Sequence, residues 1–249
     1  MTGFQLLQHA TERVFHNIYE ALAVSGLIWI GILIVQIAIF SGVDLDGIAS
    51  GEVTTVSGRT MFLLLLTNVA TAVGSSWIAV EWHRFALEGW RPTSAFPRWS
   101  GSRVFVYLFV FVGIALLIGL FIGVFFFLLA LLFGQALAML GGLFVTAIIG
   151  LPALYGFFRV SPVLPAIAIG EKLRFQEAWQ ATKPFGGAIL QVSVLGILAL
   201  AVVQIPSVLL GGGLVGLLYE LVAGWVVLMV NVSLLSSIYE LSMRSRSDG

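Results

Sequence analysis

Long, continuously apolar stretches dominate the chain, and short polar segments separate them. About 20 apolar residues of helix cross the roughly 30 Å hydrocarbon core of a bilayer, so stretches of this length predict membrane-spanning helices. They do not alternate apolar with polar residues, as the ~10-residue strands of a membrane β-barrel do. The pattern therefore predicts an all-α integral membrane fold with six transmembrane helices, over residues 21–40, 60–80, 104–133, 136–158, 185–210 and 221–241.

The third apolar stretch is longer than a bilayer requires. Its 30 residues would form about 45 Å of helix, which exceeds the hydrocarbon thickness. We expect its far end to protrude or to bend before the turn at Gly134 and Gln135.

Short amphipathic helices are predicted beside the spans. Residues 1–20 form an N-terminal segment, with a surface helix over residues 4–20 whose apolar contacts are Phe4, Leu7, Val14, Phe15 and Ile18. A signal peptide is the competing interpretation of the first apolar stretch, but the residues before it are long and mixed in charge. Short interfacial helices are also expected in the two loops described below, most clearly over residues 170–182, with Pro184 ending that helix.

Composition and charge narrow the class of protein. The chain is 59% hydrophobic and only 10% charged, which excludes a water-soluble fold. Its net charge of zero gives no basis for bulk nucleic-acid binding, and the absence of cysteine excludes disulfides and thiolate chemistry. If the N-terminus is cytoplasmic, eleven of the twelve basic residues lie inside and Arg59 alone lies outside. This asymmetry predicts a multi-pass protein of the bacterial inner membrane with both termini cytoplasmic, residues 242–249 forming a short tail.

The two longer cytoplasmic segments, residues 83–103 and 159–183, share a layout. Each begins with an arginine close after an aromatic residue and ends with a tryptophan four residues before a cation. Tryptophan and cations at span ends anchor helices at the headgroup boundary, although the spacing is also compatible with a duplicated helix–loop–helix unit. The predicted headgroup or interface residues are Trp82, His83, Arg84, Arg91, Arg98, Trp99, Arg103, Arg159, Lys172, Arg174, Trp179 and Lys183.

These loops also carry a family resemblance. Pro165-Ala166, Gly170-Glu171, Ala178-Trp179 and Thr182-Lys183 before a span resemble a family of polytopic bacterial membrane proteins. This family includes the membrane domain attached to some glycerophosphoryl diester phosphodiesterases and its stand-alone relatives. Trp82-His83-Arg84-Phe85 with Glu88-Gly89 similarly looks like inner-membrane proteins of no assigned function. The resemblance covers two loops and the six-span pattern, without a soluble phosphodiesterase domain, so it implies neither that activity nor any functional residue.

Glu220 is the most suggestive charge within the apolar pattern. If the sixth helix begins at Leu214, this carboxylate lies inside the membrane, where ionisable groups are usually functional. If the span is residues 221–241, Glu220 is interfacial, and we favour this reading because 21 residues suffice to cross. An outer ion pair between Arg59 and Glu220 is then expected.

Catalytic and metal signatures are not visible in the sequence. His83 lies between Glu81 and Glu88, but these three positions do not share a helical face. No nucleophile elbow or phosphate-binding loop occurs either. We therefore expect no metal, no cofactor and no enzymatic activity.

Two functional hypotheses remain. The leading one is a non-catalytic membrane protein that binds lipid headgroups, a membrane-protein partner or a second copy of itself through the two loops. The alternative is a small-solute transporter or permease component, in which Asn68, Gln191, Gln204 and Asn231 converge on one cavity near the midplane. Stripes of small residues, including Gly119 and Gly150, are expected to let helices pack closely.

Overall fold

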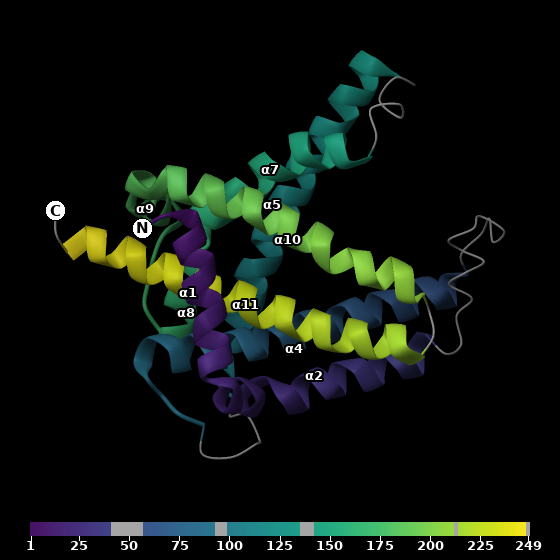
Figure 1. Cartoon of the computed structure of the whole chain (residues 1–249), viewed down its shortest axis with the longest axis horizontal. Coiled ribbons are helices and arrows are strands. Elements are labelled where there is room, and N and C mark those ends of the chain that lie inside the picture. The colour runs from purple at the N-terminus through teal and green to yellow at the C-terminus, as the bar shows by residue number, and fades with distance from the viewer. Residues whose placement is uncertain (41–56, 93–98, 135–141, 212–213, 248–249) are drawn as a thin grey trace.

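The computed structural model describes residues 1–40, 57–92, 99–134, 142–211 and 214–247, and within these ranges it contains helices and no β-strand (Figure 1). Six helices are long and apolar enough to cross a membrane, which confirms the predicted all-α, multi-pass class. They cover Ile18–Ile39, Gly58–Glu88, Ser102–Phe133, Ile148–Ile169, Lys183–Leu210 and Leu214–Arg244.

Four long helices run alongside one another and hold most of the core. They are α2 (Ile18–Phe40), α4 (Gly58–Glu88), α10 (Gly186–Leu210) and α11 (Leu214–Ser247). Helix α2 packs on α4, and α11 packs on both α4 and α10. The start of α1 and the end of α11 lie at the same end of the molecule, which we call the terminal end (Figure 1).

The remaining two spans form a hairpin that diverges from these four. Helix α5 (Ser102–Phe133) starts against α4, and α7 (Gly142–Val160) returns beside α10, while their far ends project away from the other long helices (Figure 1). Helix α5 continues without interruption to Phe133, so the expected bend before Gly134 does not occur in the helix. The C-terminal half of α5 instead projects away from the core, and the buried residues of α5 lie in its first half.

Helix α4 extends eight residues beyond the predicted end of the second span, from residue 80 to Glu88. It ends at Gly89, whose φ of 69° is the left-handed conformation that closes many helices. The added turns pack against α8 (Val163–Ile169) and α11, so the residues after Val80 belong to the core rather than to a loop.

The N-terminal helix α1 (Gly3–His16) lies across α10 and α11. Its buried face is Leu6, Ala10 and Val14, spaced four residues apart so that they line one side of the helix. Of the predicted apolar contacts, Val14 faces helices of this chain, whereas Phe4 and Phe15 are 58% and 51% exposed, so their contact with the membrane surface stays a prediction. The neighbours of α1 are helices of this same chain, and that packing selects the face.

The second predicted loop contains two short helices. Helix α8 is largely buried between α4 and α5, and α9 (Phe175–Ala181) begins five residues later than the helix expected over residues 170–182. A 3-10 turn, Lys183–Phe185, leads into α10. In the first loop, residues 93–98 lie outside the described ranges, as does the long outer loop at residues 41–56. Whether α1 and α9 contact the membrane surface stays a prediction.

Candidate functional site

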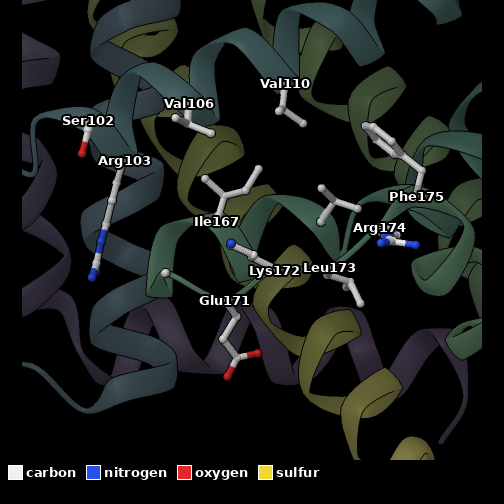
Figure 2. Close-up of a pocket in the computed structure, with 12 residues that line it drawn as sticks. Ser102, Arg103, Val106, Val110, Ile167, Glu171, Lys172, Leu173, Arg174 and Phe175 are labelled. Atoms are coloured by element: carbon white, nitrogen blue, oxygen red, sulfur yellow. The ribbon is translucent and has the colours of Figure 1, made fainter.

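A groove of about 560 Å³ lies where α5 begins, beside α8, α9 and the segment that joins them (Figure 2). The start of α5 supplies one wall, α8 supplies the floor, and residues 170–175 supply the other wall. Its lining residues are Ser102, Arg103, Val106, Val110, Val163, Ile167, Gly170, Glu171, Lys172, Leu173, Arg174 and Phe175.

Gly170 creates the chain reversal that shapes this groove. It has a φ of 85°, and it ends α8 by donating its N–H to the carbonyl of Ile167 at 3.1 Å. A Cβ at this position would lie 3.1 Å from Nη2 of Arg103, so a glycine is favoured by both conformation and space. Arg103 in turn donates from Nη1 to the carbonyl of Ala168 at 3.2 Å, which ties the start of α5 to the end of α8.

Three cations line the groove without acidic partners. Arg103 and Arg174 lie at opposite ends, with Lys172 between them (Figure 2). None of the three forms an ion pair with another residue that the structure describes. The nearby Glu171 turns away from the α5 wall, and its carboxylate accepts a hydrogen bond from the Tyr239 hydroxyl on α11 (Figure 2). The groove therefore has a net positive charge.

Apart from Ser102 and Glu171, the other side chains that line the groove are apolar, and this apolar surface continues along α5. Val106 and Val110 follow Arg103 at three and seven residues, on the same side of the helix. Helical spacing continues this side through Leu117 and Phe121, which are 68% and 41% exposed. A cationic site thus lies at one end of an exposed apolar stripe.

Trp82 and His83 are not at the surface, contrary to prediction. Both side chains are fully buried, because α4 continues past them and packs against α8 and α11. The His83 ring lies 2.8 Å from the Ser236 hydroxyl through Nδ1 and 3.2 Å from the Tyr107 hydroxyl through Nε2. His83 thus links α4 to α5 and α11 and has no access to a headgroup.

Arg84 is also engaged within the protein. Its guanidinium donates to Glu88 at 3.2 Å and to the Ser100 hydroxyl at 3.0 Å, and it lies 3.7 Å from the buried carboxylate of Glu81. The Ser100 hydroxyl in turn donates to Glu81. The guanidinium also lies 5.3 Å from the centre of the Trp90 ring. These contacts close the end of α4 onto the following loop, a role that sequence spacing did not indicate.

Arg159 is the third predicted interface residue that is buried. It donates from Nε to the Thr182 hydroxyl, from Nη1 to the Tyr155 hydroxyl and from Nη2 to the carbonyl of Trp179, all within 2.9 Å. Its guanidinium also lies 4.2 Å from the Trp179 ring centre. Arg159 therefore fastens the end of α7 to α9 and presents little charge to the surroundings.

The other predicted interface residues are at the surface but outside the groove. Arg91, Trp99, Trp179 and Lys183 are exposed. Trp99 also packs edge-on against Trp77, with ring centres 4.8 Å apart. Arg98 lies outside the described residues. Of the predicted set, Arg103, Lys172 and Arg174 are the members that come together in the groove.

The predicted outer ion pair is not formed. Arg59 and Glu220 are both exposed, and within the described residues no ion pair joins them. Glu220 lies within α11, which begins at Leu214. This start matches the first of the two alternatives, in which the sixth helix begins before Glu220. Glu220 forms no ion pair with any residue in the described ranges, and a functional role for its carboxylate stays a prediction.

The four predicted intramembrane amides do not converge. Asn68 and Asn231 each donate to a carbonyl four residues earlier on their own helix at 2.8 Å. Gln191 accepts the backbone N–H of Gly3 at 2.8 Å, and Gln204 is exposed on α10. Among the described residues no hydrogen bond joins one of these amides to another, and the transporter alternative stays a prediction.

No protein-family model, curated protein or solved structure matches the chain. The resemblance to phosphodiesterase membrane domains therefore stays a prediction, and the chemistry of the groove is the basis for proposing a function.

Proposed function

We propose that this protein is a non-catalytic inner-membrane protein that binds an anionic phospholipid in the basic groove. The observation that carries the proposal is the cluster of Arg103, Lys172 and Arg174, which lack acidic partners among the described residues and lie over an apolar floor. A phospholipid has matching chemistry, with a phosphate next to acyl chains.

The individual side chains suit a phosphate. Guanidinium groups present parallel N–H donors that match phosphate oxygens, and a lysine ammonium adds a compact charge. Because Arg103 is held by the carbonyl of Ala168, its remaining donors are positioned before a ligand arrives. The exposed stripe from Val106 to Phe121 would then accept an acyl chain along α5.

The charge asymmetry of the chain supports a location at the cytoplasmic leaflet. One wall of the groove, residues 170–175, lies in the loop between the fourth and fifth spans, and the positive-inside rule assigns that loop to the cytoplasm. Anionic lipids there attract basic residues by about 1 kcal/mol per Lys or Arg near the surface.

Neutralising the three groove cations should weaken anionic-lipid binding. In the combined variant Arg103→Gln, Lys172→Gln, Arg174→Gln, loss of about 3 kcal/mol would lower affinity for phosphatidylglycerol roughly 100-fold. The measurement is native mass spectrometry of the protein released from nanodiscs that contain phosphatidylglycerol and phosphatidylcholine.

The matched control is Arg91→Gln with Lys183→Gln, which removes two exposed cations that do not line the groove. This control should retain phosphatidylglycerol nearly as well as the unmodified protein. Equal retention by the triple variant and the unmodified protein would refute the proposal.

A further inference from the structure

Two adjoining cavities lie where the α5–α7 hairpin diverges from the other long helices. The first, of about 420 Å³, lies between α2, α4, α5, α7 and α11, and the second, of about 430 Å³, lies between α5 and α7. Phe111 and Phe157 line both cavities, so the two spaces meet at these rings. Both are separate from the basic groove, which is lined by a different side of α5.

The first cavity contains hydrogen-bonding groups that the protein does not use. The hydroxyls of Ser75 and Ser76 make no hydrogen bond to any residue in the described ranges, and Ser76 is only 3% exposed. Asn231 uses one N–H of its Nδ2 on the carbonyl of Val227, and its second N–H donates to no described residue. These groups line the cavity and are not enclosed by protein, so they remain available to a polar atom of a ligand.

The charge and shape of this cavity restrict the ligand. The residues that line it include no Asp, Glu, Lys or Arg, which selects an uncharged molecule. Its walls carry the rings of Trp29, Tyr107, Phe111 and Phe157, which suit contact with a planar ring. Two of these rings are held in place: Trp29 donates to the carbonyl of Leu221 at 3.1 Å, and Tyr107 contacts His83.

The second cavity suits an apolar tail. Its lining is entirely apolar, with Ala115, Ile118, Gly119 and Ile122 on α5 facing Gly150, Ala153 and Leu154 on α7. A Cβ at Gly119 would meet nothing within 4 Å. Small residues that sequence reasoning assigned to close packing therefore leave a hollow between the two helices.

We propose that this pair of cavities binds an uncharged, lipid-soluble ring compound with carbonyl acceptors and a long apolar tail, which is the chemistry of a prenyl quinone. The ring occupies the first cavity, with a carbonyl accepting a hydrogen bond from Ser76 or Ser75. The tail passes Phe111 and Phe157 and lies between α5 and α7. This site does not depend on the anionic-lipid function proposed above.

The test uses the full chain in nanodiscs and a benzoquinone probe with a ten-carbon tail that ends in a diazirine. Photolabelling should saturate, map to the α5 and α7 segments of the second cavity, and be displaced by the same quinone without the diazirine. A phosphatidylcholine with a diazirine in its acyl chain reports bulk lipid. If it labels these segments equally and the quinone does not displace it, the cavities hold acyl chains only and the proposal is wrong.

Three variants locate the ligand. The double variant Ser75→Ala, Ser76→Ala should lower the affinity for the quinone about fivefold, as expected for a lost hydrogen bond. Gly119→Leu should fill the tail cavity and remove the labelling between α5 and α7. Asn231→Leu should also weaken binding, whereas Asn68→Leu should leave it unchanged, because Asn68 has the same own-helix hydrogen bond but lines neither cavity.

Unchanged binding in the serine, glycine and Asn231 variants, each with a single size-exclusion peak and an unaltered unfolding midpoint, would overturn the proposal. If Gly119→Leu alone loses labelling, misfolding explains that loss equally well. The serine variant then decides, because unchanged quinone binding in that variant contradicts the proposal. Phosphatidylglycerol retention measured on the same samples reports the groove separately.

Discussion

Individual side chains explain why cations that look alike in the sequence have different roles. Arg159 donates hydrogen bonds to Thr182, Tyr155 and the carbonyl of Trp179, and it therefore links helix α7 to the segment around α9. Arg103 donates one hydrogen bond to the carbonyl of Ala168, and its other N–H groups bond to no described residue. The difference lies in the acceptors within reach, and these come from distant parts of the chain.

Gly170 offers a direct test of how the groove is built. Gly170→Ala places a Cβ in the left-handed region, at a cost of about 1–2 kcal/mol, and also against the Arg103 guanidinium. We expect a lower unfolding midpoint and weaker retention of phosphatidylglycerol, measured by thermal unfolding in detergent and by native mass spectrometry.

Gly89→Ala is the matched control for this substitution. Gly89 also has a positive φ, of 69°, but a Cβ there meets nothing within 4 Å. It should lower the unfolding midpoint without changing lipid retention. If both variants retain lipid equally, the contact between position 170 and Arg103 does not shape the groove.

At the level of elements, α1 shows how neighbouring helices select a buried face. Leu6, Ala10 and Val14 are fully buried against α10 and α11, and Arg13 at the end of this helix forms a 2.7 Å ion pair with Glu240. An amphipathic pattern alone allows several faces, because Phe4 and Phe15 are larger and more apolar than Ala10. Packing across two helices favours the small residue, which permits closer approach.

Leu6→Ala should therefore destabilise the protein more than Phe4→Ala. Loss of a fully buried leucine side chain costs about 2–5 kcal/mol, whereas an exposed phenylalanine contributes little to internal packing. The comparison is made by the unfolding midpoint and by the rate of proteolysis after α1. A larger effect of Phe4→Ala on stability would contradict the observed face.

At the level of the whole molecule, the six spans place both chain termini at the same end, as an even number of crossings requires. The segments 83–103 and 159–183, which connect spans at that end, carry eight of the twelve cations. Arg59, at the start of α4, lies at the opposite helix end. The proposed orientation, with the terminal end in the cytoplasm, follows from this charge distribution.

The absence of cysteine makes the orientation simple to test. With Arg59→Cys and Lys183→Cys as single introduced thiols, a membrane-impermeant maleimide should label position 59 in cells whose outer membrane alone is opened. Position 183 should react only after the inner membrane is permeabilised. The reverse pattern would invert the proposed topology and place the groove at the periplasmic face.

The apolar patterning of the chain was sufficient to predict six spans, because the requirement to cover about 30 Å of hydrocarbon acts on each segment separately. Local cues were also sufficient for a helix close to residues 170–182 and for cations near span ends. The positions of Trp82, His83 and Arg159 could not be read in this way. Their burial depends on α4 and α7 meeting α8, α9 and α11, which lie elsewhere along the chain.

The groove and the paired cavities depend on the same kind of long-range contact. Arg103 and Lys172 are 69 positions apart, and they share a site because α8 reverses at Gly170 beside the start of α5. Ser76, Phe111 and Phe157 meet because the α5–α7 hairpin diverges from the other helices. Hydrophobicity sets which segments enter the bilayer, whereas side-chain packing between those segments sets which polar groups are paired and which remain available to a ligand.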